Sequence, residues 1–362
     1  MRKVGIVCAF NPGNTGMFSV DLAASRVFDA WNIEHTLINF QKRRWRLPLK
    51  YQVSRTPNKL AKYSHILFWG DFQNNPVYGT RDFANREVKF RYARTAPEGV
   101  ANWTRLHLEL SSVLPKSTVV ASIGNCFLGS REAASQHNLS ASLKTFADSA
   151  VRILPRESQS GAELVEAAGG SPRSNVLTGL DPAFLLEPEK REDFRERKYF
   201  GYCFARSQVQ DVTEGLDAII KATGLTPVEV PWSVGKRRVS QRQIFSDALE
   251  AFAKCRFIVS DVYHLTVNAI NHGVPVIVLS RRQEITRSSV DDQKKSALTD
   301  QIGASGLHVM LADDASFATQ VPTVVGAYEA LMDGQTSFDE IIEGLISQKT
   351  RYRSAIKEIL CA

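Results

Sequence analysis

The chain has 362 residues, of which 43% are hydrophobic and 23% charged, and it carries a net charge of +7. This length predicts two domains of ordinary size. No apolar run approaches the roughly 20 residues that span a bilayer, so we expect a cytoplasmic protein without a transmembrane helix. The modest basic excess fits an anionic substrate or membrane surface, and it is too weak to indicate a nucleic-acid partner.

The five cysteines are odd in number and irregularly spaced, and most lie in or beside apolar segments. This distribution favours reduced thiols over both a disulfide framework and a zinc site, and we expect no bound metal. The cysteines are Cys8, Cys126, Cys203, Cys255 and Cys361.

The N-terminal segment predicts a buried strand over residues 4–9, a turn-rich loop over 11–16 and a helix over 19–31. A strand, a glycine loop and a helix in this order outline a phosphate-binding arrangement, although Walker spacing and GxGxxG are both missing. Asn14 and Gly16 are therefore candidate binding residues, with simple turn chemistry as the alternative.

A second strand is predicted over residues 35–40, and a basic loop follows it at residues 42–50. Such a loop can bind nucleic acid, an anionic membrane surface or a lipid diphosphate, and a solvated loop is the alternative. We expect peripheral contact with the inner face of a membrane. The loop interleaves Lys42, Arg43, Arg44, Arg46 and Lys50 with Trp45 and Leu47.

Two further strands, over residues 65–70 and 117–123, run into the polar residues Asp71 and Asn125. Both are candidate site residues at the carboxyl ends of strands, with a plain turn residue as the alternative. A third strand, over 151–154, places Arg156 at the same edge of the sheet.

Helices are expected in the ambiguous stretch 81–114 and over 130–150, and Ser158 is predicted to cap a helix that continues to residue 167. A short strand over 176–180 follows. Residues 187–198 lose all apolar periodicity and read as an interdomain linker.

The second half repeats the alternation, with strands over 199–205 and 227–231 and helices over 209–223 and 241–254. A helix near 293–302, a strand over 308–311 and terminal helices come last. The alternation predicts an α/β protein with two Rossmann-like, doubly wound parallel-sheet domains facing a cleft.

The segment 256–280 contains two buried strands with a short helix between them. Ser260, Asp261, Tyr263 and His264 fall where the first strand ends and the helix begins. Ligands bind at this edge of open α/β sheets, and a helix N-terminus favours an anion. The alternative is that Asp261 merely caps the helix and that His264 is a satisfied histidine.

Several motifs resemble the polysaccharide pyruvyl transferase family, whose members look like GT-B glycosyltransferases. The motifs are NPGNTGM, PRESQSGAELVEAAGG with GLDPAFLL, FARS, and FIVSDVYHLTVNAINHGVPVIVLS with DDQKKSALTDQIG. The resemblance implies a donor, phosphoenolpyruvate, and a sugar acceptor that is part of a polysaccharide or of its lipid-linked precursor, with no cofactor. It places the acceptor on an N-terminal domain (1–186) and the donor on a C-terminal domain (199–345). We expect residues 346–362 to pack back on the N-terminal domain.

By position in the family motif, His264 is expected to act as the general acid, with Asp261 beside it. Cations around the donor suit its carboxylate and phosphate, and exposed arginines at strand ends are the alternative reading for each of them. The expected donor-binding residues are Arg156, Arg206, Ser260, Tyr263, Arg281 and Arg282. The expected acceptor-binding residues are Asn14, Gly16, Asp71 and Asn125.

One position departs from the family pattern, in which an arginine usually stands two residues before the histidine. Here that residue is Val262, which cannot hold an anion. Either another arginine supplies the charge, or the donor differs, or the transfer activity is lost. The alternatives are a metal-independent GT-B glycosyltransferase that uses a sugar nucleotide, and a non-catalytic binding subunit of a polysaccharide assembly complex.

Overall fold

The computed structural model describes residues 3–8, 11, 13–41, 49–188, 193–206, 209–233, 239–281, 287–312 and 316–362. These residues form two compact units. The first contains residues 1–12, 20–186 and 349–362, and the second contains residues 13–19 and 187–348. Two helices, α1 (Thr15–Ala30) and α14 (Phe338–Cys361), have residues in both units.

The first unit has a six-stranded parallel sheet in the order β3-β2-β1-β4-β5-β6. This order is that of the doubly wound Rossmann fold, and its switch point lies between β1 and β4. The strands are buried because their residues are almost continuously apolar, as in the HILFWG run of β4. Their bounds are β1 Val4–Cys8, β2 His35–Asn39, β3 Tyr51–Val53, β4 His65–Asp71, β5 Val119–Asn125 and β6 Arg152–Leu154.

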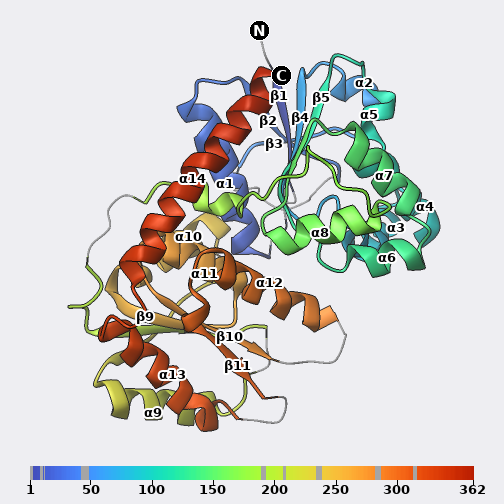
Figure 1. Cartoon of the computed structure of the whole chain (residues 1–362). Helices are drawn as coiled ribbons and strands as arrows, with labels where there is room; N and C mark the ends of the chain where they lie inside the picture. Colours follow the sequence, from blue (N-terminus) through green and yellow to red (C-terminus); the bar gives the residue numbers. More distant parts are fainter. Residues whose placement is uncertain are drawn as a thin grey trace. The chain divides into compact units, whose positions relative to one another are not determined.

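Helices cover both faces of this sheet, which Figure 1 shows between α1 with the end of α14 on one side and the group α3 to α8 on the other. Phe83, Trp103 and Phe146 pack from that group onto the sheet. The helices are α2 Pro57–Leu60, η1 Tyr78–Phe83, α3 Ala84–Lys89, α4 Ala96–Trp103, η2 Thr104–Leu108, α5 Leu110–Val113, α6 Ser130–Gln136, α7 Ser140–Ser149, α8 Ser158–Ala167 and η3 Pro182–Leu185.

The second unit has a five-stranded parallel sheet in the order β11-β10-β9-β7-β8. Counted within the unit this is the flavodoxin-like order, and its switch point lies between β7 and β9. The strands are β7 Tyr199–Cys203, β8 Thr226–Glu229, β9 Cys255–Ser260, β10 Val276–Arg281 and β11 His308–Leu311.

One face of the second sheet is covered by α9 and α13, and the other by α10, α11 and α12 (Figure 1). The helices are α9 Val212–Thr223, α10 Gln241–Lys254, α11 Tyr263–Asn271, α12 Arg287–Gln301, η4 Ser305–Leu307 and α13 Phe317–Met332. Among the described residues, no helix has the combination of length and apolar character needed to cross a membrane.

Some local predictions differ from the structure. The helix expected from residue 19 begins at Thr15, and the helix expected over 130–150 is broken at Asn138, which adopts a left-handed φ of 56°. The expected strand over 176–180 is reduced to a single bridge between Ile153 and Val176. The edge strand β3 was not predicted, because its three residues are all at least partly exposed and carry no apolar pattern.

Candidate active site

The turn between β9 and α11 lies beside the switch point of the second sheet. All residues of α11 are buried, and His264 in its first turn is 8% exposed. The rings of Tyr263 and His264 meet edge to face with 5.1 Å between their centroids. The sequence prediction that these residues stand at a strand end and a helix N-terminus is therefore correct in its local geometry.

Asp261 binds main-chain atoms of the neighbouring strand's loop. Its two carboxylate oxygens accept hydrogen bonds from the amides of Ala205 and Arg206, each at 2.8 Å. This pairing holds the loop after β7 against the end of β9. The geometry gives Asp261 a role in positioning the loop that carries Arg206, and its expected role beside His264 stays a prediction.

Ser260 and Val262 complete this turn. The Ser260 hydroxyl donates to the carbonyl of Cys203 at 2.8 Å and accepts from the Val262 amide at 3.1 Å. Ser260 therefore ties β9 to β7, and its expected contact with the donor stays a prediction. The Val262 side chain is buried and apolar.

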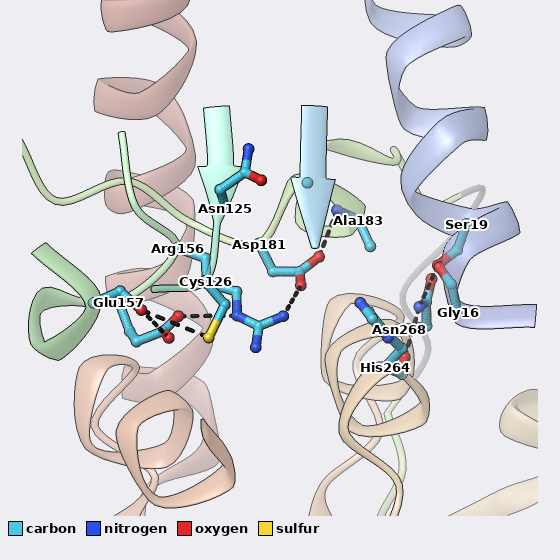
Figure 2. Close-up of polar contacts among 12 residues, drawn as sticks. Gly16, Ser19, Asn125, Cys126, Arg156, Glu157, Asp181, Ala183, His264 and Asn268 are labelled. Atoms are coloured by element: carbon cyan, nitrogen blue, oxygen red, sulfur yellow. Dashed lines mark hydrogen bonds and ion pairs between the residues drawn. The ribbon is translucent and has the colours of Figure 1, made fainter. Parts of the chain in front are cut away.

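The first turn of α1 packs against His264 within the second unit. A Cβ atom built on Gly16 would lie 2.5 Å from the Cβ of His264, so only glycine fits at this position. The Asn14 side chain accepts from the Gly16 amide at 3.0 Å, and the Ser19 hydroxyl donates to the Gly16 carbonyl at 2.8 Å. The Asn268 amide donates to Ser19 Oγ at 3.0 Å and to the His264 carbonyl at 2.7 Å (Figure 2).

These bonds bring Gly16 and Asn14 together with His264, although 248 residues separate Gly16 from His264 in the sequence. Asn14 and Gly16 were expected on the acceptor side, and the structure places both in the same unit as His264. Asn268 and Ser19 were not predicted. The available signal was the amide of Asn268 four positions after His264, a spacing that puts both residues on one helix face.

Two of the expected donor cations lie in the described part of the second unit. Arg281 is the last residue of β10 and is 8% exposed, whereas Arg206 is exposed. Arg282 lies outside the described residues, so its predicted role stays a prediction. Arg206 and Arg281 therefore follow β7 and β10, on either side of β9 in the sheet.

Arg156 lies in the first unit, where it pairs with two buried carboxylates. Its side chain is fully buried, with Nε 3.0 Å from Glu157 Oε2 and Nη1 3.8 Å from Asp181 Oδ2. The guanidinium also lies over the ring of Phe72, 5.3 Å from its centroid. Figure 2 shows the guanidinium between the two carboxylates. These two internal ion pairs give Arg156 a structural role, and its expected donor-binding role stays a prediction.

Asn125 and Asp71 also lie in the first unit. The buried Asn125 side chain accepts from the main-chain amide of Gln73 at 3.0 Å and donates to the Phe68 carbonyl at 3.2 Å. Asp71 has a left-handed φ of 58°, and its carbonyl accepts from the Cys126 amide at 2.6 Å. The expected acceptor contact of Asn125 therefore lacks support, since both ends of its amide bind the protein.

Two cysteines, Cys126 and Cys203, lie at strand ends of the two sheets. Burial raises the pKa of Cys126 and of Cys203 to about 12, so neither supplies a thiolate near neutral pH. The cysteines are free thiols. The described residues contain no group of three potential metal ligands.

Of the basic loop, residues 42–48 lie outside the described residues, so the structure does not test the predicted membrane contact.

The fold is shared with a solved transferase. An alpha-glucosyltransferase in complex with UDP matches with a TM-score of 0.51 and 11% identity, over 99% of this chain and 100% of that chain. The trehalose 6-phosphate synthase of Burkholderia multivorans matches with a TM-score of 0.48 and 10% identity, over 99% of this chain and 98% of that chain. The UDP-GlcNAc 2-epimerase of Methanocaldococcus jannaschii matches with a TM-score of 0.45 and 14% identity, over 91% of this chain and 93% of that chain. The first of these matches, together with the two parallel sheets, confirms a GT-B-like fold.

The family resemblance is confirmed as well. Residues 129–283 match the model of the polysaccharide pyruvyl transferase family. The match includes the β9–α11 turn with His264 and extends past Arg281. It indicates that the protein is a transferase. No curated protein matches the chain significantly.

Proposed function

We propose that the protein transfers a pyruvyl group from phosphoenolpyruvate to a sugar of a polysaccharide or of its lipid-linked precursor. A proton is added to C3 of the donor, one acceptor hydroxyl bonds to C2 and loses its proton, and the C2–O bond to phosphate breaks. A second hydroxyl then bonds to C2 and loses its proton, giving a pyruvate ketal and inorganic phosphate; of the two hydroxyl protons released, one balances the proton added to C3 and the other leaves with phosphate. No net oxidation occurs.

The observation that carries this proposal is the position of His264 inside the family match, in the first turn of a helix at a sheet edge. An imidazole there can deliver the proton to C3 as a general acid. Gly16 lies directly against the ring and leaves no room for a side chain. The packing therefore fixes the position of the imidazole.

The donor's carboxylate and phosphate need cations or hydrogen-bond donors, because leaving such charges unpaired in a protein is very costly. Arg206 and Arg281, which follow strands on either side of β9, are the proposed cations, and the N-terminus of α11 adds a partial positive charge. Arg282 stays in the proposal on sequence grounds. Arg156 is left out, since it is already paired, and Val262 contributes no charge.

These groups belong to the second unit, so we assign the donor to that unit and the acceptor to the first. For the basic loop we keep the prediction that it binds an anionic acceptor or a membrane surface. Neutralising Arg43, Arg44 and Arg46 together should weaken liposome binding in a salt-dependent way and spare donor binding. An equal loss of donor binding would contradict this assignment.

The decisive test is phosphate release from phosphoenolpyruvate in the presence of a panel of acceptor saccharides, free and lipid-linked. His264→Gln should lower turnover at least about 100-fold, the usual size of a general-acid contribution, while the Kd for phosphoenolpyruvate changes less than about threefold. The exposed His137 provides the control His137→Gln, which should behave like the wild type.

Calorimetry separates this proposal from the alternatives. Binding of a uridine or guanosine sugar diphosphate without binding of phosphoenolpyruvate would favour the glycosyltransferase alternative. Acceptor binding with no turnover on any donor would favour the non-catalytic binding subunit.

A further inference from the structure

A buried lysine on α12 connects two strand ends of the second sheet. Lys295 is 1% exposed, and its ammonium lies 2.8 Å from the carbonyl of Leu279 and 3.3 Å from the carbonyl of Asp261. Asp292, one turn earlier on the same helix, pairs with it at 2.6 Å. Figure 1 shows α12 beside β10. Each hydrogen on the ammonium therefore has an acceptor.

The two carbonyls lie where the pairing of β9 and β10 stops. The last paired residues are Ser260 and Val278, and Asp261 and Leu279 come next in each strand. Lys295 thus joins the two strands one residue beyond their last paired residues. His264 on α11 follows Asp261 closely in the sequence, and Arg281 at the end of β10 follows Leu279.

Keeping a charge at this place costs stability. Burial lowers the pKa of Lys295, and the neighbouring Asp292 only partly offsets that effect. An apolar side chain of similar length would fill the same space without this cost, and buried ion pairs are often no more stable than such replacements. The ammonium, in contrast, supplies directed bonds to two separate main-chain segments.

We propose that Lys295 is a positioning residue for the transfer reaction, which fixes the segment carrying His264 relative to the segment carrying Arg281. This inference rests on the proposed function for its catalytic consequence. The described contacts of its ammonium are to protein atoms, so the proposal gives Lys295 no direct contact with substrate. Its effect is on the relative placement of the proton donor and the donor-binding cation.

The test is Lys295→Met, compared with Arg256→Met on the same sheet. Arg256 lies at the opposite, amino end of β9, where it is half-buried and bonds the Arg197 carbonyl and the Tyr328 hydroxyl. Both variants lose main-chain anchoring of β9, so both should lose some thermal stability. Only Lys295→Met should lower kcat, by about 10- to 100-fold, the size expected when a reacting group moves by an ångström or less.

Two readouts distinguish positioning from general destabilisation. Assays run where circular dichroism shows full folding should give a reduced kcat and a KM for phosphoenolpyruvate within about threefold of wild type. The imidazole resonance of His264, assigned by its loss in His264→Gln, should move in Lys295→Met and stay in place in Arg256→Met. If Lys295→Met fails to fold, Asp292→Ala should give smaller changes in the same direction.

Unchanged kcat and an unchanged His264 resonance in Lys295→Met would overturn the inference, and so would equal losses in Arg256→Met. If the wild type releases no phosphate from phosphoenolpyruvate, the proposed function fails by itself. The His264 resonance then still decides whether Lys295 positions that segment.

Discussion

The buried charged side chains at the carboxyl edges of the two sheets have different kinds of partner. In the first unit Arg156 pairs with the carboxylates of Glu157 and Asp181, so side-chain charges neutralise one another. In the second unit Asp261 accepts from two main-chain amides, and Lys295, besides its ion pair with Asp292, donates to two main-chain carbonyls. The second arrangement holds strand ends in place around His264, whereas the first is a closed electrostatic cluster.

The switch points differ in the same sense. In the first sheet the side-chain amide of Gln73 donates to the carbonyls of Val7 at 2.7 Å and Trp69 at 2.8 Å. A side chain therefore occupies the ends of β1 and β4, where Rossmann folds commonly hold a ligand. In the second sheet the corresponding ends are joined through Asp261, and an imidazole follows three residues later. A polar residue after a strand therefore indicates a sheet edge, and its partners decide whether it serves structure or chemistry.

The largest expected effect is the loss of the first cluster's cation. Arg156→Met leaves Glu157 and Asp181 buried without their counter-charge, which should cost about 3 to 5 kcal/mol in the free energy of unfolding, measured in urea. The exposed Arg131, paired with Glu166, is the control, and Arg131→Ala should cost at most about 1 kcal/mol. Folded Arg156→Met should bind phosphoenolpyruvate like the wild type. A stable variant that has lost donor binding would break the comparison.

A buried acid whose carboxylate bonds a hydroxyl extends the comparison. Asp21 accepts from the Tyr51 hydroxyl at 2.7 Å, and burial raises its pKa to about 7. Between pH 4 and 7 the folded state keeps a proton that the unfolded state releases, so stability falls as pH rises through this window and the penalty is complete above it. Asp21→Asn removes the penalty.

Urea unfolding should therefore find Asp21→Asn close to wild type at pH 4 and more stable at pH 8, by up to about 4 kcal/mol. Asp29→Asn, an exposed change on the same helix, should show no such trend. A stability difference between Asp21→Asn and wild type that is the same at every pH would contradict the assignment.

A smaller effect is expected at the contact between Gly16 and His264. Gly16→Ala brings a methyl group within 2.5 Å of the His264 side chain, so one of them must move. Overpacking of this kind costs about 1 to 3 kcal/mol, and we expect kcat for phosphate release to fall about tenfold. Gly344→Ala, in open space on α14, should instead raise stability by about 0.5 to 1 kcal/mol. Wild-type kcat in Gly16→Ala would show that the contact does not constrain the imidazole.

The smallest effect is expected for Asp261→Asn. Asparagine has one acceptor oxygen for the two amides of Ala205 and Arg206, so one bond is lost. Because both residues are exposed, water can replace it, and the cost should be about 1 kcal/mol. Release of the loop should weaken phosphoenolpyruvate binding about two- to fivefold in calorimetry. The exposed change Asp217→Asn should leave the Kd unaltered, and a large loss of kcat in Asp261→Asn would point to a direct catalytic role instead.

Most of the fold could be predicted from the sequence because strands buried on both faces leave continuous apolar runs, as in β4 and β10. The short β3 and the break at Asn138 left no such signal, since an exposed edge strand and one left-handed residue change little in the apolar pattern. The turn at His264 was also predictable, from the change of strand to helix.

The partners of the charged residues were not predictable from local patterns. Arg156 meets Asp181 across 25 residues, and Asp261 meets Ala205 across 56, so each pairing depends on how distant segments are folded together. The sequence therefore suggested that Arg156 was a ligand cation without revealing its two internal carboxylate partners. Lys295 was overlooked for the complementary reason, since a lysine beside two aspartates and a second lysine looks like a solvated helix face.

The helix α1 has a consequence for dividing the chain. Its first turn, with Gly16 and Ser19, belongs to the second unit, while the rest belongs to the first. Separate expression of residues 1–186 and 187–362 would therefore take from the second fragment the turn that packs on His264 and bonds Asn268. The second fragment would also keep residues 349–362, which belong to the first unit. A complementation assay with the two fragments should thus require both pieces at once, and neither is expected to behave as an autonomous module.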